Sequence, residues 1–161
     1  IAEIKNDLEG AVEYLQEGLN MAKEIGMQDT TAIILIFLGR IKVQQGYWEL
    51  AIPYMRESLI VVKSGKVGTD GPAIVFCQIG GALLNDKPGI GVQLLGQSEI
   101  FWQKTQFPRD PTWDKPYFER FISAARAKLS EAEFTSAWEA GLKMTQEEAV
   151  ELALKVVEEL R

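Results

Sequence analysis

Apolar residues recur at helical spacing along nearly the whole chain, and no stretch alternates between apolar and polar residues as a half-buried strand does. Glycines and prolines divide the pattern into segments. The segmentation predicts helices over about residues 7–25, 29–45, 47–64, 73–84, 86–105, 117–129, 131–141 and 146–161. We therefore expect an all-α protein.

Local signals mark where several of these helices begin and end. Gly26 follows the first apolar stripe, and glycine readily adopts the left-handed conformation that closes a helix. Ser130 with Glu133, and Thr145 with Glu148, have the spacing of a capping box, in which each side chain bonds the other residue's backbone N–H. These pairs predict the starts of the last two helices.

A period of forty residues runs through the first two thirds of the chain. Segments 7–19, 47–59 and 87–99 share one pattern, with a small residue at the same place in each: Ala11, Ala51 and Gly91. Such a period indicates repeated units that stack on their neighbours, and a small side chain lets two helices approach closely. We predict a solenoid, an architecture that usually binds rather than catalyses.

The period is lost at a proline-rich stretch. Residues 107–116 hold three of the six prolines and read as a stiff, non-helical linker. We predict helical repeats over 1–106 (a truncated first repeat and two full pairs), the linker over 107–116, and a three-helix C-terminal cap over 117–161. The chain starts at an isoleucine, and because residues 1–5 look like the end of a helix, we expect it to be a piece of a larger protein.

The repeat region resembles the tetratricopeptide (TPR) family, whose helical pairs carry an L-G pair followed by a later small residue. The residues in register are Leu35, Leu38, Gly39, Gly46, Ala51, Met55 and Ser58, then Phe76, Ile79, Gly80, Gly91, Leu95 and Ser98. Ala11, Leu15 and Leu19 match the second helix of a truncated copy. The likeness covers about residues 6–105, although the usual unit is ~34 residues rather than 40. It implies a right-handed α-solenoid of TPR-like hairpins.

The tail over residues 117–154 is similar to the segment that closes the repeat region in STAND-class signalling ATPases and related bacterial transcription regulators. The residues that carry this likeness are Phe134, Ala137, Trp138, Gly141, Thr145, Glu148, Ala149 and Ala153. The resemblance implies a sensor or regulatory arm, with the nucleotide-binding motor upstream. It also implies a part in signal transduction or transcription regulation.

Composition narrows the classes of partner. A formal net charge of −6 argues against direct nucleic-acid binding, which needs a basic surface. No apolar run reaches the ~18 residues that span a bilayer, so we expect no membrane segment. Cys77 is the only cysteine, which favours a reducing, cytoplasmic location over a disulfide framework.

No residue pattern supports catalysis. The absence of histidine removes the usual general base and the usual zinc ligands. The sequence GKVGTDG at 65–71 has its Gly-Lys too early for a phosphate loop. Asp110 and Asp114 beside Trp113 read as a linker with a helix cap rather than a sugar or cation site. We predict no catalytic residue, no cofactor and no metal, and therefore not an enzyme.

The remaining candidate site is the concave groove that the TPR resemblance implies, lined by the first helix of each pair. The predicted groove residues are Ile33, Ile36, Arg40, Gln44, Cys77, Gly81 and Asn85. The guanidinium of Arg40 offers a fork of donors for a carboxylate or a peptide carbonyl. The alternative for the isoleucines is that they belong to the core.

We expect the partner to be a protein, a peptide or a neighbouring domain of the parent chain. The alternative is a small-molecule effector in the same groove, and homo-oligomerisation stays open. Aromatic residues gather around the linker and tail, and we interpret them as packing the cap onto the last repeat rather than as a partner hot spot. They are Phe101, Trp102, Trp113, Phe118, Phe121, Phe134 and Trp138.

Overall fold

The computed structural model describes residues 2–65, 70–105, 109, 111 and 114–159. Over these residues the secondary structure consists of eight α-helices, which confirms the all-α prediction. They are α1 (Ala2–Glu24), α2 (Gln28–Gln44), α3 (Trp48–Lys63), α4 (Asp70–Leu83), α5 (Pro88–Lys104), α6 (Asp114–Lys128), α7 (Glu131–Lys143) and α8 (Gln146–Glu159).

Most helix ends lie within a few residues of the prediction. Gly26 and Gly46 have φ of 73° and 81° and close α1 and α2, a conformation that costs glycine nothing. Helix α1 begins at Ala2, five residues before the expected start, and α6 begins at Asp114, inside the stretch predicted as linker. Pro116 is in the first turn of α6, where a backbone N–H makes no intrahelical hydrogen bond, so the lack of one costs nothing. The negative charge of Asp114 in the same turn interacts favourably with the positive end of the helix dipole.

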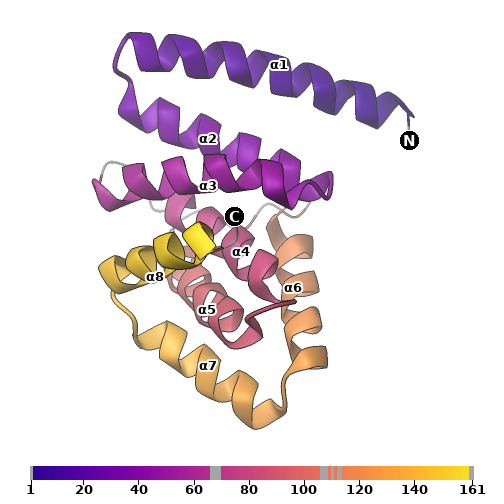
Figure 1. Cartoon of the computed structure of the whole chain (residues 1–161), viewed down its shortest axis with the longest axis vertical. Coiled ribbons are helices and arrows are strands. Elements are labelled where there is room, and N and C mark those ends of the chain that lie inside the picture. Colours follow the sequence, from indigo (N-terminus) through magenta and orange to yellow (C-terminus); the bar gives the residue numbers. More distant parts are fainter. Residues whose placement is uncertain (1, 66–69, 106–108, 110, 112–113, 160–161) are drawn as a thin grey trace.

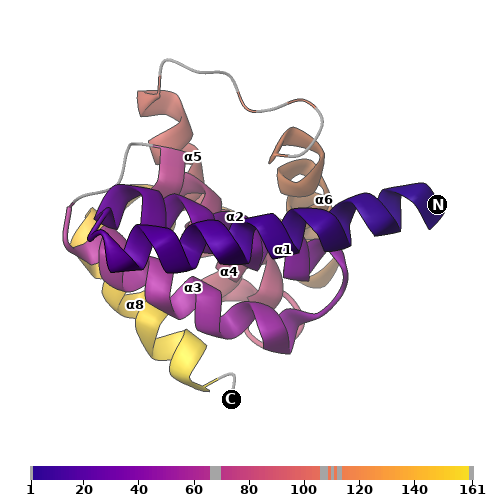
Figure 2. The same ribbon diagram turned by 90° about the horizontal axis from the view of Figure 1, so that it is seen from above.

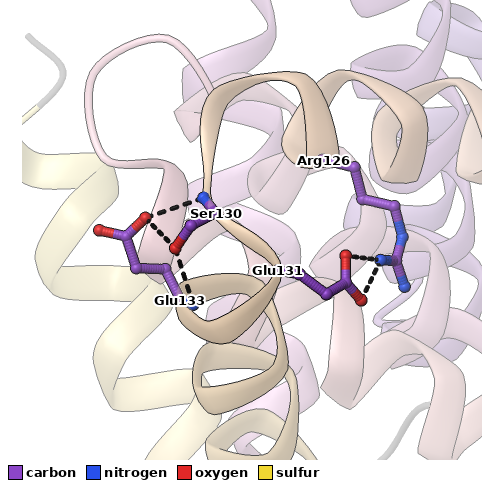
Figure 3. A network of polar contacts seen from close by, with 4 residues as sticks. All are labelled: Arg126, Ser130, Glu131 and Glu133. Atoms are coloured by element: carbon purple, nitrogen blue, oxygen red, sulfur yellow. Dashed lines mark hydrogen bonds and ion pairs between the residues drawn. The ribbon is translucent and has the colours of Figure 1, made fainter.

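Both predicted capping boxes are present. The Ser130 hydroxyl accepts from the Glu133 N–H at 3.3 Å, and the Ser130 N–H donates to the Glu133 carboxylate at 2.8 Å (Figure 3). Thr145 and Glu148 make the same exchange at 3.2 and 2.8 Å. These bonds satisfy donors that a helix start otherwise leaves open, so each box fixes where its helix begins.

Each helix from α1 to α5 contacts the next one along the chain, and the tail then returns to the middle. Helices α1, α2 and α3 lie one above another, with α1 at one end of the molecule and α7 at the opposite end (Figure 1). The N-terminal part of α1 projects past α2, as a second view also shows (Figure 2). Helix α7 packs on α5, α6 lies against α4 and α5, and α8 folds back onto α3.

Helix α5 is central because small residues let it approach helices on two sides. A Cβ placed on Gly91 would lie 2.6 Å from the Gly80 carbonyl oxygen, so α4 and α5 touch through their backbones. On another face, a Cβ on Gly96 would lie 3.0 Å from the Trp138 carbonyl oxygen of α7. Of the three small residues that recur in the sequence, Ala51 and Gly91 are buried, and Ala11 is half-buried.

Two large hydrophobic clusters share the interior. One joins residues of α2, α3, α4, α5 and α8, including Leu59, Phe76 and Val157. The other joins α4 and α5 to the cap, and its aromatic members include Phe121 and Phe134. Helices α6, α7 and α8 are therefore joined to α2–α5 by shared hydrophobic clusters. The cap aromatics described here pack inward, as predicted, while Trp113 lies outside the described residues.

Candidate binding groove

The α2–α4 groove is defined here as the surface lined by Arg40, Val43 and Gln44 of α2 and by Ile74, Cys77 and Gln78 of α4. Three of the seven predicted groove residues, Arg40, Gln44 and Cys77, meet there. Arg40 and Gln44 lie on one face of α2, and they meet Cys77 because α2 packs against α4.

The other four predicted residues have different surroundings. Ile36 is 3% exposed and belongs to the core, which was the alternative interpretation for this residue. Ile33 is 47% exposed and lies outside the groove lining. Asn85 is also exposed, because α4 ends at Leu83 and the chain has turned away. Gly81 lies next to the groove, beneath the ring of Phe121.

The groove is already occupied by the chain's own α6. Tyr117 and Phe121 of α6, together with Trp102 of α5, cover it and leave a cavity of about 20 Å³. That volume holds roughly one water molecule. The described structure therefore has a filled groove rather than an open cleft.

An ion pair fixes the start of α6 on α2. The Arg40 Nη1 donates to Asp114 Oδ1 at 2.9 Å, and the side chains are 18% and 12% exposed. The Arg40 guanidinium also lies 4.6 Å from the centre of the Phe37 ring one turn earlier, which orients it. Arg40 thus pairs with a carboxylate of the protein itself, and its binding of a partner's carboxylate or carbonyl stays a prediction.

The ring of Phe121 lies directly against Gly81, in a space (called the seat below) that is open only because residue 81 has no side chain. A Cβ added to Gly81 would overlap three carbon atoms of the Phe121 ring. The same ring lies 6.5 Å from the ring of Trp48 and 6.1 Å from that of Tyr117. The absence of a side chain at position 81 therefore lets α6 approach α4 closely.

The chemistry inside the groove is that of a binding surface. Burial raises the pKa of the Cys77 thiol from 9.0 to about 12, against the opposing influence of Arg109, so the thiol stays protonated and weakly nucleophilic at neutral pH. Gln78 is 5% exposed, and its amide nitrogen has no hydrogen-bond partner among the described residues. The groove thus combines the guanidinium of Arg40, which is paired with Asp114, an apolar lining, and a buried amide nitrogen of Gln78 that has no acceptor among the described residues.

Outside the groove, the described residues offer neither a metal site nor a membrane-spanning helix. Among them, no cluster of three or more acidic, cysteine or histidine residues is placed to hold a metal ion. No helix in the described part of the chain has the length and hydropathy needed to cross a bilayer. The sequence 65–71, in which a phosphate loop was considered, falls largely on residues 66–69, which lie outside the described residues, as does Asp110.

The sequence interpretation missed the α6 side of the site. Asp114 was assigned to a linker and Phe121 to cap packing, and neither was connected with Arg40. A signal was available, because Asp114, Tyr117 and Phe121 follow the i, i+3, i+7 spacing of one helix face. Comparison of the chain with protein-family models, with curated proteins and with solved structures found no match.

Proposed function

We propose that this chain is a non-catalytic interaction and regulatory domain that binds a protein, a peptide or a neighbouring domain through the α2–α4 groove. We further propose that its hairpins form a right-handed TPR-like α-solenoid closed by a helical cap. Two helix pairs support the repeat, because the same contact recurs in each. A Cβ on Gly39 would lie 3.8 Å from Met55 Cγ, and one on Gly80 would lie 3.0 Å from Leu95 Cγ. Met55 and Leu95 are forty residues apart.

The observation that carries the binding function is the occupied groove. A helix lies across it, held at one end by the pairing of Arg40 with Asp114 and further along by Phe121 in the seat above Gly81. Helix-in-groove recognition uses these elements, an apolar face with anchors at helical spacing and a charged residue that sets orientation. The groove is therefore built to receive a polypeptide segment.

The wider setting of the proposal comes from the resemblance of the tail. We propose that the domain is the C-terminal sensor arm of a larger bacterial signalling ATPase or transcription regulator in the cytoplasm. The order of capped helices at Ser130 and Thr145 supports the likeness of residues 117–154 to that tail. The formal net charge of −6 makes a protein partner the better expectation than nucleic acid.

Charge reversal at Arg40 tests the function. Proteins captured by the immobilised domain would be identified and their affinities measured for wild type, Arg40→Glu and Lys155→Glu. Lys155 is exposed on α8 away from the groove, so its reversal changes net charge equally and serves as the matched control. Because Arg40 also pairs with Asp114 of α6, the comparison is made in an Asp114→Asn background, where we expect Arg40→Glu alone to weaken a specific partner at least tenfold. Equal affinities of every captured partner for the folded variants would refute the groove assignment.

A second candidate is a small-molecule effector in the same groove, and the observation that favours it is the buried amide nitrogen of Gln78, which has no hydrogen-bond partner among the described residues. Ligand binding to the native state raises the melting temperature by mass action. A metabolite set that raises the melting temperature of wild type but not of Arg40→Glu would support this candidate. The cavity of about 20 Å³ is too small for a metabolite while α6 is docked, so the polypeptide partner stays first.

A further inference from the structure

Building on the proposed function, we infer that the α2–α4 groove is a receptor for an amphipathic helix of a partner protein, with a carboxylate in its first turn and aromatic residues three and seven positions later. Helix α6 occupies this receptor in cis. A partner with the same pattern therefore binds in competition with α6.

The pattern comes from the helix that the groove already holds. Asp114, Tyr117 and Phe121 are the α6 residues that line the cavity, and this spacing places them on one helix face. Lys115 and Glu119 of the same helix are exposed. The groove thus contacts one face of α6 and leaves the other open, as a receptor for a helical peptide does.

The receptor side is complementary in charge and in shape. Arg40 is stacked on Phe37 and pairs with Asp114, so a cation faces the first turn of the bound helix. Gly81 and Trp48 form the seat that holds the Phe121 ring. One end of the groove binds a carboxylate through Arg40, and the other end binds an aromatic ring beside Gly81 and Trp48. These two different contacts fix the direction in which a helix lies in the groove.

Helix α6 does not use everything that the groove offers. Gln78 lines the cavity, and its buried amide nitrogen has no acceptor among the described residues. A buried donor left unpaired weakens the docked state. A partner helix that also brings an acceptor, such as a serine or asparagine side chain, would satisfy Gln78 and outcompete α6.

Competition follows from the space available. The cavity of about 20 Å³ beneath α6 admits about one water molecule, so a partner helix enters only when α6 leaves. Affinity for a partner is then reduced by the fraction of molecules in which α6 is docked. Weakening the α6 anchors therefore strengthens binding in trans.

The test uses the chain's own segment as the probe. A fluorescent peptide with the sequence of residues 109–129 is titrated with wild type and with the variant Asp114→Asn/Phe121→Ala, and anisotropy is recorded. The variant keeps the groove intact while its own α6 loses both anchors. We expect it to bind the peptide at least tenfold more tightly than wild type. A control peptide carrying the same two changes should bind at least tenfold more weakly than the unmodified peptide.

Two glycine substitutions in the double variant separate the seat from general effects. Gly81→Ala fills the seat and should weaken peptide binding at least tenfold. Gly89→Ala is the matched control, because a Cβ there meets nothing within 4 Å, and binding should not change. Circular dichroism checks that each variant is folded. If the double variant does not fold, Asp114→Asn alone should still bind the peptide more tightly than wild type.

Three results would overturn the inference. The first is a folded double variant with which the anisotropy of the peptide does not change. The second is peptide binding that Gly81→Ala leaves unchanged. The third is a double variant that is a dimer on size exclusion and binds no peptide, which would make a second copy of the chain the occupant of the groove. If the peptide does not bind but the captured partners are still weakened by Arg40→Glu, only the proposed helix pattern is rejected. Insensitivity of those partners to Arg40→Glu would reject the proposed function itself.

Discussion

The crossing of α4 and α5 gives the sharpest test of the packing. In Gly91→Ala the new Cβ would lie 2.6 Å from the Gly80 carbonyl oxygen, whereas ordinary contact starts at 3.4 Å. The helices must therefore separate by about 0.8 Å (3.4 minus 2.6), because a backbone oxygen cannot rotate away. A gap of that size loses about a quarter to a half of each pairwise attraction along the contact.

Two terms set the expected magnitude. Overpacking of a core costs roughly 1–3 kcal/mol, and Gly→Ala in a helix gains about 0.5–1 kcal/mol. We expect Gly91→Ala to lower the free energy of unfolding by about 1–2 kcal/mol. In a chain of this length that corresponds to a decrease in melting temperature of several degrees, at about 2–4 °C per kcal/mol.

The assay is urea unfolding followed by far-UV circular dichroism, with Gly10→Ala as the control. Gly10 is within α1 and a Cβ there meets nothing within 4 Å, so this change should raise stability by about 0.5–1 kcal/mol. Equal m-values would show that both variants unfold the same structure. If Gly91→Ala were as stable as Gly10→Ala, the close crossing of α4 and α5 would be wrong.

Three further predictions concern buried and capping groups. Gln97→Met removes an amide that donates to two carbonyl oxygens at the end of α7, at 2.6 and 2.7 Å, and should cost about 1–3 kcal/mol in urea unfolding. Cys77 should react with iodoacetamide at pH 8 about a thousandfold more slowly in the native than in the unfolded chain, because burial raises its pKa from 9.0 to about 12. The thiol of the unfolded chain ionises at a lower pH than the buried thiol. Above pH 9 the free energy of unfolding should therefore decrease with pH more steeply in wild type than in Cys77→Ala, by up to about 1.4 kcal/mol per pH unit. Equal decreases in the two proteins would contradict the burial of Cys77. Ser130→Ala should cost about 1 kcal/mol at pH 7. Because the Ser130 hydrogen bonds lower the Glu133 pKa below 4.5, the difference between wild type and this variant should shrink as pH falls through that lowered value; a difference independent of pH would argue against the box.

Part of the candidate site was accessible from sequence. Arg40 and Cys77 were placed in the groove because residues on one helix face stay together wherever that helix packs. Asn85 is exposed and outside the groove lining because it follows the end of α4, where the chain no longer keeps the helix face that lines the groove. Ile36 could not be separated from the core by pattern alone, since core and groove residues have the same helical spacing.

The sequence by itself determined that the chain is helical and where several of its helices begin or end. Helical periodicity, the positive φ of Gly26 and the capping box of Ser130 and Glu133 depend on contacts within a few residues, so a linear pattern contains them. Only the tertiary structure decided what fills the groove. Arg40 and Asp114 are 74 residues apart, and their pairing requires α6 to return over α4, which no local interaction specifies. That return depends on the shape of the completed core, where a glycine at position 81 leaves room for an aromatic ring.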